Sequence, residues 1–154
     1  MWSGVQVQAK FFDADNRLVT TESAYIGDLH PGENAAGGSL WQPPATPTRM
    51  DVVILDGGSL FDDTADGALT IDQLAITNPD SSSATVTGNV TSTFTEEQSF
   101  VELILVWRDA ANAVVFSASS YTDTVPANGS ATFEADLYGD NLPTTPPNEV
   151  YWSV

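Results

Sequence analysis

Cysteine is absent from the 154 residues, so the chain forms no disulfide, no thiolate metal site and no cysteine nucleophile. Basic side chains are almost as scarce: three Arg and one Lys stand against 21 acidic residues, for a net charge of −17. Such a chain repels phosphate backbones and anionic lipid headgroups. We therefore expect no nucleic-acid partner, and we read the scattered acids mainly as a solvated surface.

Long apolar runs are also missing, since none approaches the roughly 18 residues of a membrane-spanning helix. We expect no membrane insertion. The first ten residues lack the basic and apolar regions of a signal peptide. His30 is the only histidine, so no His-based zinc site is possible, and no G-x-S-x-G motif accompanies it. We expect an exposed turn histidine and no enzyme.

What the chain does contain is period-two alternation of apolar and polar residues, with abundant Thr, Val, Ser, Gly and Pro. This pattern is typical of half-buried strands, and no window shows a helical stripe. The sequence therefore predicts an all-β fold. The expected strands cover 5–12, 18–25, 35–41, 49–55, 69–77, 84–94, 100–108, 113–121, 131–138 and 149–154.

Two stretches 96 positions apart resemble each other, "KFFDADNRLV" and "VWRDAANAVV". The alignment runs from Val5 on Val101 to Tyr25 on Tyr121 and, after a one-residue shift, to "SLW" on "DLY". In each stretch, Asp (Asp13, Asp109) opens a tight hairpin turn and Asn takes the left-handed position of a bulged loop. We interpret the pattern as an internal repeat of about fifty residues.

The stretches "FFDADNRLV…DLHPGE" and "VWRDAANAVV…PANGSATFEADLY" resemble the FxLYD family of bacterial and archaeal Ig-like surface modules. The resemblance covers most of 69–154 and much of 1–55, and "LYGD" departs from the expected closing tetrad. It implies an Ig-like antiparallel β-sandwich built from two related repeats. It also implies a noncatalytic, extracytoplasmic module without active-site residues.

The expected organisation is an incomplete four-stranded repeat over 1–55, an acidic Gly/Asp linker over 56–68 and a complete sandwich repeat over 69–154. A four-stranded remnant exposes an apolar face and an open edge. Three explanations stay open: the chain is cut from a longer protein, the two copies share one sandwich, or a neighbouring chain donates a strand.

Residues 62–73, "DDTADGALTIDQ", partly match the calcium-loop pattern, but Thr64 and Gln73 replace two ligands and strands replace the flanking helices. A solvated linker explains them as well. If calcium binds, the candidate ligands are Asp62, Asp63, Asp66 and Asp72.

Other candidates have plain structural readings beside functional ones. "NVT" at Asn89 and "NGS" at Asn128 are N-glycosylation sequons, which also arise by chance in a Ser/Thr-rich chain. The paired acids of "FTEEQSF", Glu96 and Glu97, are expected in a turn. The remaining candidates are aromatics that either form a carbohydrate or peptide platform or cap a core: Trp2, Trp41, Tyr138 and Trp152.

The function expected from the sequence is structural or adhesive interaction at a cell surface, by an exported protein. If a neighbouring chain completes the first repeat, the protein assembles through strand complementation as an oligomer or filament. The partner is expected to be a protein or glycan, or the chain itself. The alternative is a calcium-stiffened module that binds carbohydrate or protein.

Overall fold

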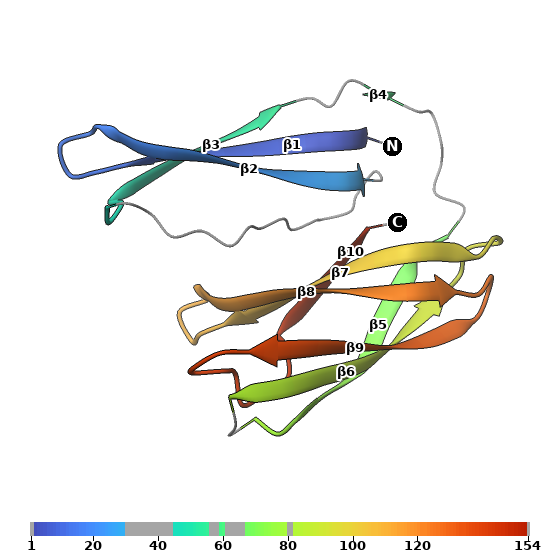
Figure 1. The fold of residues 1–154 in the computed structure, drawn as a ribbon. Coiled ribbons are helices and arrows are strands. Elements are labelled where there is room, and N and C mark those ends of the chain that lie inside the picture. Colours follow the sequence, from blue (N-terminus) through green and yellow to red (C-terminus); the bar gives the residue numbers. More distant parts are fainter. Residues whose placement is uncertain (1, 30–44, 56–58, 61–66, 80–81, 154) are drawn as a thin grey trace. The chain divides into compact units, whose positions relative to one another are not determined.

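The computed structural model describes residues 2–29, 45–55, 59–60, 67–79 and 82–153. Every regular element among them is a β-strand, as the alternation predicted, and all pairings are antiparallel. The chain divides into two compact units, residues 1–64 and 65–154. Each unit is described by itself below (Figure 1).

The first unit is one sheet in the order β2-β1-β3, made of β1 (Trp2–Phe12), β2 (Leu18–Leu29) and β3 (Arg49–Leu55). A two-residue strand, β4 (Ser59–Leu60), also pairs with β1, beyond the end of β3. The linker predicted over 56–68 thus includes one paired segment of the first sheet. The strand predicted over 35–41 lies outside the described residues.

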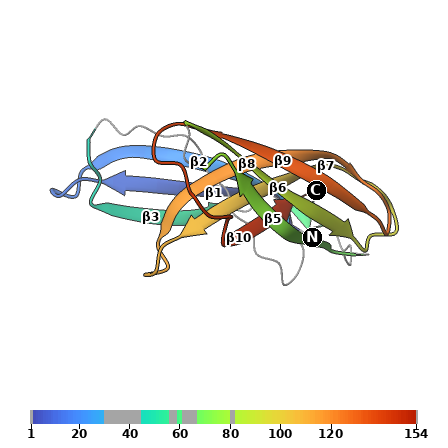
Figure 2. The ribbon, with the colours of Figure 1, turned by 90° about the horizontal axis from the view of Figure 1, so that it is seen from below.

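The second unit holds two three-stranded sheets (Figure 2). One has the order β5-β6-β9, from β5 (Leu69–Thr77), β6 (Ser83–Ser92) and β9 (Ser130–Tyr138). The other has the order β10-β7-β8, from β7 (Gln98–Arg108), β8 (Val114–Val125) and β10 (Glu149–Ser153). This arrangement is consistent with the predicted β-sandwich, and the predicted strands of 69–154 are confirmed.

The core of the second unit lies between these two sheets. Alternate residues of β7 face it, and Val101, Leu103 and Leu105 are fully buried. Val86 and Val90 of β6 meet them from the other sheet. Burying a side chain of this kind contributes about 1.5–3 kcal/mol relative to leaving it in water. Alternation therefore decides which side of each strand becomes core.

Two aromatic pairs close the core. Trp107 and Phe116 pack edge to face with ring centroids 5.3 Å apart, and Phe94 meets Trp152 in the same way at 6.1 Å. The Trp107 indole N–H donates to the Thr145 carbonyl at 2.7 Å, so its one polar atom is satisfied. Trp152 is therefore packed against the core, as the capping interpretation predicted.

Gly88 in the middle of β6 makes room for a core ring. A Cβ at this position would lie 2.5 Å from the Phe133 side chain of β9 and 2.9 Å from that of Leu74. These distances are too short for any larger residue without displacing its neighbours. Phe133 can be 3% exposed because residue 88 has no side chain.

Candidate functional site

The candidate site is the exposed apolar strand β3 of the first unit. All seven of its residues are exposed, and five of them are apolar. We call these five side chains the β3 surface; their exposed fractions are Met50 55%, Val52 51%, Val53 41%, Ile54 64% and Leu55 39%. Monomeric proteins seldom leave so many adjacent apolar side chains in water, so such a strand marks an interaction surface.

The register shows that the β3 surface covers both faces of the strand. Met50, Val52 and Ile54 lie opposite Phe11, Ala9 and Val7 of β1. Val53 and Leu55 lie opposite Gln8 and Gln6 and therefore on the other face. Among the described residues, β3 is paired only on its β1 side. A strand that is apolar on both faces is typical of positions covered from both sides.

The charges at the start of β3 form an ion pair and so cancel one another. Arg49 forms an ion pair with Asp51 at 3.2 Å, and its guanidinium lies 4.1 Å from the centroid of the Phe12 ring. Both charged side chains are about half exposed, so the pair contributes little to stability. Its consequence is local neutrality beside the apolar residues.

Strand β10 of the second unit holds the same place beside β7 that β3 holds beside β1. Its residues Val150 and Trp152 lie opposite Leu105 and Leu103 and pack against the core. Glu149, Tyr151 and Ser153 alternate with them on the other face. Unlike β3, β10 thus has one apolar face and one largely polar face, and its described residues are all half-buried.

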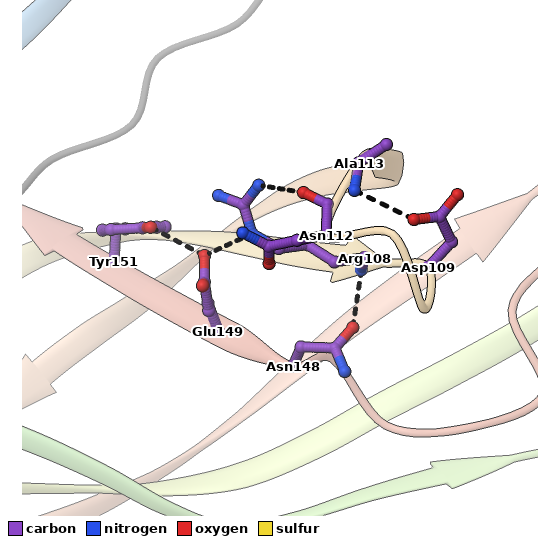
Figure 3. Close-up of polar contacts among 7 residues, drawn as sticks. All are labelled: Arg108, Asp109, Asn112, Ala113, Asn148, Glu149 and Tyr151. Atoms are coloured by element: carbon purple, nitrogen blue, oxygen red, sulfur yellow. Dashed lines mark hydrogen bonds and ion pairs between the residues drawn. The ribbon is translucent and has the colours of Figure 1, made fainter.

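A polar network covers the outer face of β10 (Figure 3). Arg108 donates from Nε to Glu149 Oε2 at 3.0 Å, and the Tyr151 hydroxyl donates to the same oxygen at 2.7 Å. Arg108 also donates from Nη1 to the Asn112 carbonyl at 3.1 Å. One arginine thereby connects β10 to the hairpin that joins β7 and β8.

The hydrogen bonds of this network shift the pKa values of Glu149 and Arg108. The hydrogen bond from Tyr151 and then the one from Arg108 hold the pKa of Glu149 below its ordinary value. The hydrogen bond to Glu149 raises the pKa of Arg108. Farther along the same sheet, the Tyr121 hydroxyl donates to Glu102 Oε1 at 3.1 Å, and this bond raises the pKa of Tyr121. Each of these pKa shifts is explained by a hydrogen bond within the second unit.

The two hairpins close with the same hydrogen bonds, as predicted for both turns. Asp13 Oδ1 accepts from the backbone N–H groups two and four residues later, at 2.9 and 2.8 Å. Asp109 Oδ1 does the same, at 2.9 Å in both cases (the second is drawn in Figure 3). Asn16 and Asn112 take the left-handed conformation with φ of 63° and 65°. The structural interpretation of both aspartates is confirmed.

The ladders of both hairpins also slip by one residue at matching places, between Phe11 and Phe12 and between Trp107 and Arg108. The bulged loop inferred from the sequence is thereby confirmed in each hairpin. That the two units are copies of one another stays a prediction. Residues 30–44, which contain part of the aligned first copy, lie outside the described residues.

The predicted calcium ligands are not brought together in the part of the chain that is described. Asp62, Asp63 and Asp66 lie outside it. Asp72 is exposed on β5, and its Oδ1 accepts from Asn89 Nδ2 at 3.4 Å. The described residues include no group of three His, Asp or Glu side chains arranged to hold a metal ion. Calcium binding stays a prediction.

The two sequons occupy different environments. Asn89 is half-buried in β6, the middle strand of its sheet, and its Nδ2 also donates to Thr91 Oγ1 at 3.2 Å. Asn128 is exposed in the turn before β9, has φ of 47°, and donates its backbone N–H to the Phe94 carbonyl at 2.9 Å. Of the two, Asn128 offers the more accessible side chain.

Several other predicted positions can be placed. Glu96 and Glu97 are exposed in the turn between β6 and β7, as expected. Tyr138 is 73% exposed at the end of β9, so the capping interpretation does not hold for it. Trp2 lies in β1, and His30 and Trp41 lie outside the described residues.

No family model, curated protein or solved structure matches the chain. The search for membrane-spanning segments found no sufficiently long and apolar helix in the described ranges. Function must therefore be inferred from the residues themselves, and above all from the β3 surface.

Proposed function

We propose that the chain is a noncatalytic structural or adhesive protein of a cell surface, which works outside the cytoplasm and contacts its partner through a sheet edge. The observation that carries this proposal is the β3 surface. Its five apolar side chains are 39–64% exposed on both faces of an edge strand. Function then consists of presenting a preformed strand for pairing, and it needs no reaction centre.

The physical mechanism is strand addition. An edge strand offers unpaired backbone N–H and C=O groups, which supply affinity by bonding a strand of the partner. Side chains on the two faces supply selectivity, because an incoming strand must place apolar groups beside Val52, Val53 and Ile54. The adjacent Arg49–Asp51 pair adds no net charge to oppose it.

An exported location fits the composition. The excess of 21 acidic over four basic residues agrees with a surface exposed to solvent, and the sequon at the exposed Asn128 agrees with export. The resemblance to Ig-like FxLYD surface modules points the same way. The matching Asp and Asn turns of the two hairpins support this kinship.

Two measurements on cells of the source organism test the proposal. Protease added to intact cells should degrade the full-length protein while a cytoplasmic marker survives. Fluorescently labelled chain added to the same cells should bind saturably. Val53→Lys should weaken this binding, whereas Val115→Lys, at a 61% exposed position of β8, should not. A protein that resists protease until the cells are lysed, and that does not bind intact cells, contradicts the proposal.

A further inference from the structure

We infer that β3 pairs with β3 of a second copy of this chain. The two strands run antiparallel across a two-fold axis and join the first units into one sheet whose main path has the order β2-β1-β3-β3-β1-β2. This inference deepens the proposed function, on which it rests, by naming the partner at the sheet edge. Three observations carry it: the contrast between β3 and β10, the register available to two β3 strands, and the distribution of charge.

The contrast with β10 shows that β3 departs from the requirements of an ordinary edge. In the predicted repeat, Gln8 of β1 aligns with Ile104 of β7, so their pairing partners Val53 and Tyr151 correspond. In the same way Gln6 aligns with Glu102, so Leu55 corresponds to Ser153. At these two positions β10 presents hydroxyl groups, and β3 presents hydrocarbon. Edge strands normally carry polar groups that discourage pairing. The β3 sequence instead favours pairing.

The β3 sequence is also complementary to itself. With a two-fold axis at Val52, Val52 faces its own copy, Met50 faces Ile54 and Asp51 faces Val53. Apolar side chains then meet across the axis on one face, and no two like charges lie directly opposite one another. An axis at Val53 places Val53 against its copy and Val52 against Ile54, with the same result. No foreign strand is needed to satisfy the edge.

The charge distribution favours the first unit for self-association. The first unit, residues 1–64, holds three basic and nine acidic side chains, for a net charge of −6. The second unit, residues 65–154, holds one basic and twelve acidic side chains, for a net charge of −11. Like-charged surfaces repel, so two copies approach at least cost through their first units. Isologous two-fold contacts of this kind are the commonest form of oligomer.

The contact is expected to be reversible. One seven-residue strand from each copy places it at the low end of specific interfaces, below about 1,200 Å² of total buried surface. Salt screens the repulsion between two chains of net charge −17, so the dimer should be favoured by molar salt.

Single cysteines provide a direct test, because the chain contains none. In the full chain, Val52→Cys and Val53→Cys each place a thiol at one of the two axes. Directly opposed residues of paired strands are close enough for a disulfide. The matched controls are Val114→Cys and Val115→Cys, at positions of β8 that are 55% and 61% exposed. Circular dichroism checks that all four variants keep the strand spectrum of the parent.

Under mild oxidation, at least one β3 variant should form covalent dimer about tenfold faster than both controls, since pairing raises the local thiol concentration. Faster linkage at Val52 or at Val53 identifies the axis, and either result supports the pairing. Light scattering of the unmodified chain should show a mass that rises with concentration and with salt.

Cross-linking of both β3 variants at the control rate, with a monomer mass at every concentration, overturns the inference. If labelled chain still binds intact cells in a Val53-dependent way, the strand pairs with another protein and the proposed function stands. If cell binding is lost as well, both proposals fail.

Discussion

Thr122 in the core of the second unit allows a quantitative test of the packing argument. It lies on β8 directly opposite Val101 and is 3% exposed. Its hydroxyl oxygen has no hydrogen-bond partner among the described residues. A buried hydroxyl without a partner loses its bonds to water and costs about 1–3 kcal/mol. Replacing the hydroxyl by a methyl group, in Thr122→Val, should therefore stabilise the unit.

The expected gain is about 1 kcal/mol, the lower end of that range, because valine keeps the branched shape and adds little new packing. For a domain the size of the second unit, residues 65–154, this corresponds to a rise of about 4–8 °C in melting temperature. Differential scanning calorimetry at neutral pH measures it. The relevant signal is the unfolding transition of the second unit, in which residue 122 lies.

Ser120→Ala is the matched control, two residues earlier on the same face of β8. The Ser120 hydroxyl donates to the Glu134 carbonyl of β9 at 2.8 Å and so connects the two sheets. Removing this bond should lower stability by about 1 kcal/mol. The two variants should therefore shift melting in opposite directions. If Thr122→Val lowers the melting temperature as Ser120→Ala does, the Thr122 hydroxyl is bonded in solution and the reasoning fails.

Three further predictions use the turns and the ionised groups. Asp109→Ala in the second unit and Asp13→Ala in the first each remove two turn hydrogen bonds and should lower stability by about 1–2 kcal/mol. In calorimetry the two variants should shift different unfolding transitions; if both shift the same transition, the two units do not unfold separately. Glu149 has a lowered pKa, so its contribution is present above its ordinary value of 4.5 and is lost as pH falls through the folded-state pKa. Glu149→Gln should be less stable than the parent at pH 7, with a difference that closes in acid during urea unfolding; a difference independent of pH would refute this. Tyr121 has a raised pKa, so its contribution is present below its ordinary value of 10.0 and is lost as pH rises through the folded-state pKa. Tyr121→Phe should therefore remove from the absorbance titration a phenol that titrates above its ordinary pKa, and loss of a phenol that titrates at the ordinary value would argue against the bond to Glu102.

Strand positions were predictable because alternation is imposed by the geometry of the strand itself. The residues Val101, Leu103, Leu105 and Trp107 recur at every second position, and each is buried. The ends were less predictable: β8 continues to Val125, where the sequence suggested residue 121, because pairing with β7 extends to Gln98. Pairing partners, and not local preference, decide where a strand stops.

The hairpin turns were predictable for a similar reason. Aspartate oxygens can reach backbone N–H groups two and four residues later, and asparagine tolerates a left-handed φ, so "DADN" and "DAAN" leave little choice of turn. Both turns form with the expected bonds. Local chemistry that closes within five residues can be read without knowledge of the remaining fold.

Whether an aromatic residue is buried or exposed could not be predicted from the sequence. Trp152 and Tyr138 both lie near the ends of predicted strands, and the sequence suggested the same two roles for both, a binding platform or a core cap. In the structure Trp152 lies opposite Leu103 and packs on Phe94, whereas Tyr138 follows the buried Leu137 and is 73% exposed. The parity of a residue within its strand decides which face it joins. Parity can be counted from the sequence only when one buried residue of the strand is already known.

The exposure of the β3 surface could not be predicted either, because it depends on how the whole sheet is paired. "RMDVVIL" and "NEVYWS" both read as closing apolar strands, and a continuous apolar run alone does not distinguish a covered strand from an exposed edge. Only the two registers, taken together with the predicted repeat, match Val53 to Tyr151 and Leu55 to Ser153. Once those places are matched, the β3 residues are too apolar for a solvated edge, and the missing cover must come from outside the described strands. A strand paired along β3 occupies its free backbone edge and places apolar neighbours beside these side chains, and for this reason the β3 edge is the position at which assembly should be sought.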